Sequence, residues 1–345
     1  MICFTWWGLT QYAARAIEAF NQVSKEPVVV VATRPKSSPV EGMERILSCP
    51  LVWVEETDTD VLSRLPEVPR VVLVSNWNLP CWQELMTKTR DTGGKVVAMV
   101  DTNYQLSLRG LLRAVRFRLF LKRRFDAFLV VGASGLRLMR LWGVPSSKVF
   151  QGLYGADASL FHNGLPLTER PKRILYVGQF INRKNVLRLV KAFGRFHAKF
   201  PDWELEMCGH GPLRDQMPKM KGLVVHDFVQ PEELAGIYRQ ARGFILPSLE
   251  EHWGVVVHEA ALSGCFLILS RTVGAAEDFA GCSNSSLFSP GSVNEIERSL
   301  EFFASRSDDE LVAAQKCSLA LAERLGLHRF VSEMQNLVCT IGRRG

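Results

Sequence analysis

Short apolar runs alternate with amphipathic segments along the first part of the chain. The runs predict buried strands at residues 1–6, 28–32, 51–54, 70–74, 95–100 and 127–131, and residues 12–23 have the spacing of an amphipathic helix. Strands that alternate with helices in this way predict a doubly wound parallel sheet. Ligands of such sheets bind beyond the carboxyl ends of the strands, so the loops there are the first candidates for a site.

The same alternation returns in the second half of the chain. Strands are predicted at 173–177, 203–207, 243–246 and 266–270, and helices at 186–200 and 232–240. The intervening segment 163–172 is rich in proline, glycine and charge, which is typical of a domain boundary. The sequence therefore predicts an α/β protein of two domains.

The stretch 246–264 holds two carboxylates around a predicted helix start. Glu251 precedes a helix that begins near Gly254 and ends at Gly264, and Glu259 lies in its second turn. Free N–H groups at a helix start favour an anion, and carboxylates accept hydrogen bonds from hydroxyls. A nucleotide sugar, with ribose, pyrophosphate and hexose, has this arrangement of groups. The alternative is an ordinary loop and helix with Glu259 solvated, and the valine run 255–257 is also compatible with a strand.

The motif Pro-Ser-x-x-Glu-x-Trp-Gly-x-x-x-x-Glu-Ala over 247–260 resembles the donor-site signature of glycosyltransferase family four, a retaining GT-B family. The resemblance covers residues 130–300 well and the first 125 residues by pattern only. It implies two doubly wound Rossmann-like domains facing a cleft, 1–163 for the acceptor and 164–327 for the donor. A C-terminal helix at about 328–345 would pack back on the first domain.

The resemblance also implies a reaction. A hexosyl group would pass from a nucleotide diphosphate sugar, a UDP-sugar first and a GDP-sugar second, to an acceptor hydroxyl with retained configuration. The nucleotide sugar is a co-substrate, and neither a cofactor nor a metal is expected. Two alternatives from other classes are a GT-B nucleotide-sugar epimerase and a catalytically silent nucleotide-sugar-binding protein.

Site residues follow from the family's motifs. Lys184 matches the lysine that grips the donor pyrophosphate, and Arg183 would supply a second charge because Gln179 replaces the usual arginine. Glu251 would orient the sugar, and Glu259 would hold the ribose hydroxyls. The expected donor contacts are Gly8, Gly178, Arg183, Lys184, Gly209, Gly211, Phe228, Glu251, Trp253, Gly254, Val255, Val256 and Glu259. Gly8 is equally compatible with a plain turn.

Asp101 occupies the position where many family members place a histidine beside the reacting carbon. It would replace that histidine as a polar contact or base, which makes Glu251, Lys184 and Asp101 the expected catalytic residues; alternatively, Asp101 caps the following helix. The pair Asp58 and Asp60 has the Asp-x-Asp spacing of a GT-A metal site. Because a short helical segment follows, Asp58 or Thr59 is instead expected to be an N-cap.

The excess of positive charge lies in the first half of the chain. Residues 1–160 hold 20 Lys and Arg against 14 Asp and Glu, whereas 161–345 hold 22 against 21. At 100° per residue, a helix over 107–125 places five arginines in one stripe: Arg109, Arg113, Arg116, Arg123 and Arg124. Leu108, Leu111, Val115 and Leu119 lie roughly opposite and are expected to pack on the sheet.

The stripe is either a solvated face or a surface for an anionic membrane or a phosphate-bearing acceptor. We therefore expect a lipid-linked or cell-envelope saccharide acceptor, such as a lipopolysaccharide core. Nucleic acid is not expected, because no reader module accompanies the charge. Eight scattered cysteines and the lack of a signal-peptide pattern favour a cytoplasmic protein, peripheral on the inner face of the membrane. The oligomeric state is not predicted.

Overall fold

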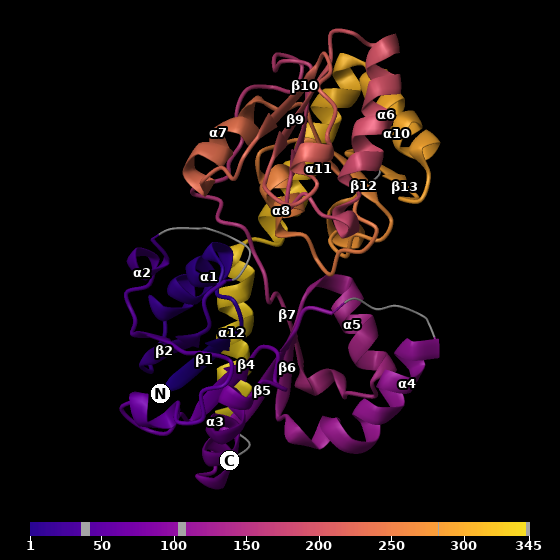
Figure 1. The fold of residues 1–345 in the computed structure, drawn as a ribbon. Coiled ribbons are helices and arrows are strands. Elements are labelled where there is room, and N and C mark those ends of the chain that lie inside the picture. Colours follow the sequence, from indigo (N-terminus) through magenta and orange to yellow (C-terminus); the bar gives the residue numbers. More distant parts are fainter. Residues whose placement is uncertain (36–41, 103–107, 282, 343–345) are drawn as a thin grey trace. The chain divides into compact units, whose positions relative to one another are not determined.

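The computed structural model describes the whole chain except residues 36–41, 103–107, 282 and 343–345, and the side chains of Leu108 and Arg109 also lie outside the described part. Two compact units are present, unit 1 (Met1–Gly155 with Leu327–Gly345) and unit 2 (Ala156–Gly326) (Figure 1). Residues 156–163, predicted to end the first domain, fold with unit 2. The Ala156 N–H donates to His258 Nδ1 (3.0 Å), and Asn163 Oδ1 accepts from the Arg170 guanidinium (3.1 Å).

Unit 1 is built around a seven-stranded parallel sheet of order β3-β2-β1-β4-β5-β6-β7. Its elements are β1 (Ile2–Trp6), α1 (Gln11–Asn21), β2 (Val28–Ala32), α2 (Met43–Ile46), β3 (Leu51–Trp53), η1 (Leu62–Arg64), β4 (Val71–Val74), α3 (Pro80–Asp91), β5 (Lys95–Val100), α4 (Leu108–Arg116), η2 (Phe117–Leu121), η3 (Lys122–Arg124), β6 (Ala127–Val130), α5 (Gly132–Leu141), η4 (Ser146–Lys148), β7 (Val149–Gln151) and α12 (Leu327–Gly342).

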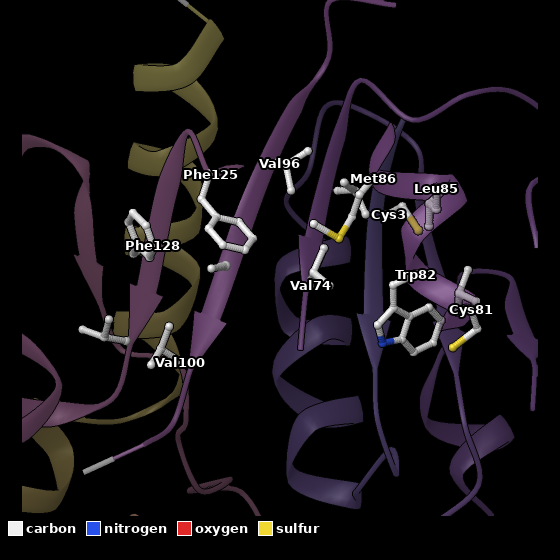
Figure 2. Packing of buried hydrophobic residues seen from close by; sticks show 14 of the residues in the cluster. Cys3, Val74, Cys81, Trp82, Leu85, Met86, Val96, Val100, Phe125 and Phe128 are labelled. Carbon is white, nitrogen blue, oxygen red and sulfur yellow. The ribbon is translucent and has the colours of Figure 1, made fainter. Parts of the chain in front are cut away.

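Both faces of this sheet are covered, which explains why its central strands are continuous apolar runs. On one face, the Phe4 ring contacts Phe20 of α1 and Phe330 of α12, with centroids 6.0 and 6.5 Å apart. On the other face, α3 contributes Trp82, Leu85 and Met86 to a buried cluster with the strands (Figure 2). The sheet therefore holds the strand ends, and the loops that follow them, in fixed positions.

Unit 2 has a six-stranded parallel sheet of order β10-β9-β8-β11-β12-β13. Its elements are β8 (Arg173–Val177), η5 (Asn182–Lys184), α6 (Val186–Lys199), β9 (Glu204–Cys208), η6 (Arg214–Gln216), β10 (Leu223–His226), α7 (Pro231–Gln240), β11 (Gly243–Leu246), α8 (Val255–Leu262), β12 (Phe266–Ser270), α9 (Ala276–Phe279), β13 (Ser285–Phe288), α10 (Val293–Ala304) and α11 (Asp308–Arg324). Both units thus have the doubly wound α/β architecture that the sequence predicts.

The expectation that Asp58 or Thr59 caps a helix is wrong. The segment that follows forms only the single 3-10 turn η1, with Val61 at its N-cap position. The Asp58 carboxylate instead accepts the Glu55 N–H (3.1 Å) and pairs with Arg64 at 2.9 Å. In the described part of the chain, no group of three or more His, Cys, Asp or Glu side chains is placed to hold a metal ion.

The segment predicted as one helix over 107–125 changes pitch twice. After α4 it forms a π turn, η2, and then a 3-10 turn, η3. The five arginines therefore do not follow a constant 100° per residue. Arg124 is half-buried and donates to Gln83 of α3 (2.9 Å), and the Arg109 side chain lies outside the described residues.

The packing side of this segment also differs from the expectation. Leu111, Val115 and Leu119 are exposed, whereas Ala114 and Phe117 are buried. Phe117 stacks on Trp142 with ring centroids 4.1 Å apart. No helix among the described residues has the length and apolar character needed to cross a bilayer.

Candidate functional site

The order of the strands in unit 2 reverses between β8 and β11, which pair with each other as neighbours. At such a switch point, the loops after the two strands leave in opposite directions and open a crevice for ligands. The loop after β8 covers residues 178–185, and the loop after β11 covers residues 247–254. These are the two loops that carry the predicted cations and the first predicted carboxylate.

A buried ion pair joins the two loops. Lys184 Nζ pairs with Glu251 Oε2, and each residue is only 8% exposed. Arg183 lies 3.6 Å from the other carboxylate oxygen, and the Ser248 hydroxyl donates to Glu251 Oε2 (3.1 Å). Burial alone would raise the pKa of the Glu251 carboxyl, but the two cations and Ser248 outweigh burial and hold that pKa below its ordinary value. Glu251 is therefore an anion at neutral pH.

Backbone contacts fix the loops against each other. The Arg183 guanidinium donates to the Glu250 carbonyl (2.8 Å), and the Leu249 N–H donates to the Arg183 carbonyl (2.8 Å). Asn185, in the left-handed conformation at φ 62°, donates from its side-chain amide to the Pro247 carbonyl (3.0 Å). The charged groups are thus held in place before any ligand arrives, which is the condition for electrostatic stabilisation of a transition state.

Helix α8 begins directly beside this ion pair. Gly254 is its N-cap at φ 93°, a conformation that favours glycine, and a Cβ there would come within 3.3 Å of Glu251 Cγ. The first-turn N–H groups of Val255 and Val256 have no partner within the helix, as at any helix start. Partial positive charge and the two cations therefore lie at the same edge of the sheet.

Glu259 contacts a different helix. Its carboxylate accepts a hydrogen bond from the Tyr238 hydroxyl of α7 (3.0 Å). Burial raises the pKa of Glu259 to about 7, although the Tyr238 hydrogen bond lowers it in part. The spacing that singled out Glu251 and Glu259 thus leads to two different environments, a paired low-pKa carboxylate and a desolvated high-pKa one.

The glycines of the neighbouring loops have a packing role. A Cβ on Gly209 would collide with the Gly178 carbonyl, and one on Gly211 would lie 2.6 Å from the Phe180 carbonyl oxygen. The Phe228 ring, in the loop after β10, lies beside His210 of the loop after β9, with centroids 5.8 Å apart. Close packing of the loops is therefore sufficient to require glycine at 209 and 211. Donor binding by Gly209 and Gly211 stays a prediction.

Trp253 is buried in the loop before α8. Its ring packs edge-on against Phe279, and its backbone carbonyl accepts the Ala275 N–H (3.0 Å). The indole N–H has no hydrogen-bond partner within the described part of the chain. Trp253 therefore anchors the loop through its ring and its backbone.

The predicted residues of unit 1 lie at that unit's own switch point and at the end of β5. Gly8, at φ 63°, follows β1 and donates its N–H to Thr33 Oγ1 (2.7 Å). The Tyr154 hydroxyl donates to Asp101 Oδ2 (3.1 Å), and the Tyr12 ring lies 5.2 Å from that of Tyr154. The alternative that Asp101 caps the following helix stays a prediction, because residues 103–107, which precede the described start of α4 at Leu108, lie outside the described part.

Comparison with known proteins agrees with this geometry. The sequence model of the family described as glycosyl transferases group 1 matches residues 158–316, which include both loops of the ion pair.

That match covers 159 of the 345 residues, or 46% of the chain.

The curated relatives include transferases of different names. The chain is 29% identical over 177 residues to the sulfoquinovosyl transferase SQD2 of Arabidopsis thaliana, covering 48% of this chain and 33% of that protein. It is 31% identical over 148 residues to the D-inositol 3-phosphate glycosyltransferase of Corynebacterium kroppenstedtii, covering 35% of this chain and 33% of that protein. The chain thus spans about a third of the length of these curated relatives.

The fold extends the likeness to both units. The HepE protein of Anabaena, solved in complex with UDP, has a TM-score of 0.75 at 11% identity, covering 98% of this chain and 99% of that chain. At that identity the likeness concerns the fold alone. The fold is GT-B, with two Rossmann-like α/β units as predicted.

Three polar partners of the predicted residues escaped the sequence analysis. Ser248 contacts Glu251, Tyr238 contacts Glu259, and Tyr154 contacts Asp101. A signal existed only for Ser248, because a serine three residues before a carboxylate in a turn is within hydrogen-bonding reach of it. The tyrosines are 21 and 53 residues from their partners, so local spacing cannot reveal them.

Proposed function

We propose that the chain transfers a hexosyl group from a nucleotide diphosphate sugar, a UDP-sugar first and a GDP-sugar second, to an acceptor hydroxyl with retained configuration. The observation that carries the proposal is the buried Lys184–Glu251 ion pair, with Arg183 beside it, at the start of α8. The group 1 match of residues 158–316 and the UDP bound to HepE support the donor class. For the acceptor we propose a lipid-linked or cell-envelope saccharide, on the cytoplasmic face of a membrane.

In this reaction the bond between the anomeric carbon and the diphosphate oxygen breaks, and a bond to the acceptor oxygen forms. Lys184, Arg183 and the α8 N–H groups would bind the diphosphate and stabilise the charge that it gains on leaving. Glu251 remains ionised beside them, so it would accept hydrogen bonds from sugar hydroxyls and stabilise positive charge on the ring. Asp101 or the departing diphosphate would take the proton of the acceptor hydroxyl. No step requires a metal ion.

The proposal is tested by a thermal-shift screen with UDP- and GDP-sugars, followed by NMR of the products. A ligand at about 100 times its Kd adds about 2.7 kcal/mol of stability, which is a clear shift. We expect one donor to stabilise the protein and to yield a retained glycoside in the presence of EDTA. An epimerised sugar formed without acceptor, binding without transfer or hydrolysis, or activity that is lost in EDTA and restored by Mn²⁺ would each contradict the proposal.

Glu259 gives a pH dependence to donor binding. We propose that it accepts the ribose hydroxyls, and the ionised form is the stronger acceptor. Because its pKa is about 7, UDP affinity should rise by up to about tenfold from pH 6 to pH 8. Isothermal titration of the wild type and Glu259→Gln measures this rise, since the variant retains only the titration of UDP itself. Equal pH profiles in the two proteins would exclude Glu259 from the ribose site.

The same carboxyl affects folding. Its pKa in the folded protein lies above the ordinary value of 4.5, so the fold holds the proton more tightly than the unfolded chain does. The free energy of unfolding should therefore fall as pH rises from about 4.5 to 7, and Glu259→Gln should remove that contribution.

A further inference from the structure

Five large apolar side chains are exposed on one continuous helical segment of unit 1. Exposure is 42% for Leu111, 72% for Leu112, 53% for Val115, 65% for Leu119 and 71% for Phe120. We call these five residues the outer face of α4–η2. A contiguous apolar surface of this kind on a folded helix indicates a binding surface, because folding alone would have buried it.

The opposite side of the segment is attached to the core. Ala114 and Phe117 are buried, and Phe117 packs between Trp142 and Phe128, with ring centroids at 4.1 and 5.7 Å. The Arg118 guanidinium donates to the Leu141 carbonyl at the end of α5 (3.0 Å). These contacts hold the helix in the orientation that directs its apolar residues outward.

Exposed apolar residues elsewhere in the described chain are scattered. Leu165, Val224 and Phe302 of unit 2, for example, are 51%, 39% and 44% exposed and come from separate elements or loops. Single residues of this kind are normal on any protein surface. The outer face of α4–η2 differs because its five residues fall within ten consecutive positions.

Cations border the apolar residues. Arg113 and Arg116 of α4 and Arg123 of η3 are exposed, and the sequence has no acidic residue between Asp101 and Asp126. A second copy of this chain would bring the same cations together across a symmetric interface, which is unfavourable. Charge complementarity therefore favours an anionic partner that also accepts apolar side chains.

We propose that the outer face of α4–η2 inserts into the surface of a membrane that contains anionic lipids. The five apolar side chains would enter the boundary between headgroups and acyl chains, and the arginines would pair with lipid phosphates. The helix would lie parallel to the surface. Membrane insertion itself does not depend on the proposed function. Its consequence rests on that function, namely that a lipid-linked acceptor is present where the enzyme binds.

Sedimentation with sucrose-loaded vesicles, without donor or acceptor, tests the proposal. The wild type should sediment with phosphatidylcholine vesicles that contain phosphatidylglycerol, and not with phosphatidylcholine alone. Leu112→Gln with Phe120→Gln should weaken binding about tenfold or more, because two exposed side chains lose their apolar burial. Arg113→Gln with Arg116→Gln should weaken it and reduce its dependence on salt. Phe302→Gln, which removes an exposed aromatic side chain from α10 of unit 2, should have no effect.

Three outcomes would overturn the proposal. If Leu112→Gln with Phe120→Gln binds as the wild type does, charge alone attaches the protein and nothing inserts. The proposal also fails if the wild type does not bind anionic vesicles at low salt. It fails as well if the wild type forms a dimer that Leu112→Gln with Phe120→Gln abolishes, because a second copy then covers the outer face of α4–η2. A thermal shift of each variant with the nucleotide sugar verifies that the variant is folded. Because this measurement uses no vesicles, it distinguishes failure of membrane binding from failure of the proposed transfer.

Discussion

Replacing Glu251 by glutamine is expected to lower the turnover number by about 10²–10³-fold and to leave the donor KM within about threefold. Glutamine keeps the shape of the side chain and can still accept from the Ser248 hydroxyl, but it removes the negative charge. Glycosyl transfer passes through a transition state with positive charge on the sugar ring. A buried anion held at low pKa by Lys184 and Arg183 would stabilise that charge more than it stabilises the bound donor.

The neighbouring Glu250 provides the control. It is also a carboxylate of the same loop, but it is exposed, and Glu250→Gln should retain wild-type turnover. Steady-state kinetics with the donor found in the thermal-shift screen would measure both variants. An unchanged turnover number in Glu251→Gln would remove this residue from the chemistry, and a raised donor KM alone would assign it to binding.

Replacing Lys184 by methionine should destabilise unit 2 by about 3–5 kcal/mol at neutral pH and abolish transfer. The change leaves Glu251 buried with Arg183 as its remaining cation, at 3.6 Å and with a side chain that is 42% exposed. Burial then dominates and the pKa of Glu251 rises. The destabilisation should shrink as pH falls, because Glu251 takes up a proton and no longer needs a partner. Urea unfolding at pH 7 and at pH 5 measures the difference.

A second substitution separates stability from catalysis. Lys184→Met with Glu251→Leu replaces the whole ion pair by apolar groups, which often recovers stability, so the double variant should fold well yet remain inactive. Lys191→Met, at an exposed position of α6, should change neither quantity. If Lys184→Met alone is as stable as the wild type at pH 7, the ion pair does not form in solution.

The sequence predicted the sheets well, because parallel strands buried on both faces leave uninterrupted apolar runs. Strands β2, β5 and β12 begin and end at the predicted residues. The start of α8 was also predictable, since Gly254 and Gly264 mark its ends. Loop motifs led to Lys184 and Glu251 separately, but their direct pairing depends on β8 and β11 being neighbours, which is a property of the topology.

The segment 107–125 shows where periodicity fails. Its regular spacing predicts a leucine face that packs inward, yet Ala114 and Phe117 are the residues that the core accepts. The reversal is already present in α4, where Ala114 is buried and Leu111 and Val115 are exposed, so it precedes the π turn at Phe117. The rule that apolar residues are buried also predicts the wrong face of a helix where exposed apolar side chains bind a partner.

The discontinuity of unit 1 has a consequence for the order in which the protein matures. Helix α12 supplies Phe330, Met334 and Leu337 to a core that otherwise comes from residues 1–155. During synthesis the ribosome completes unit 2 before it makes α12. The sheet of unit 1 therefore waits without α12, and Phe4 without its contact to Phe330, through the translation of more than 170 residues. Unit 2, which is continuous in the chain, can fold during that interval, so the later half of the polypeptide is able to mature first.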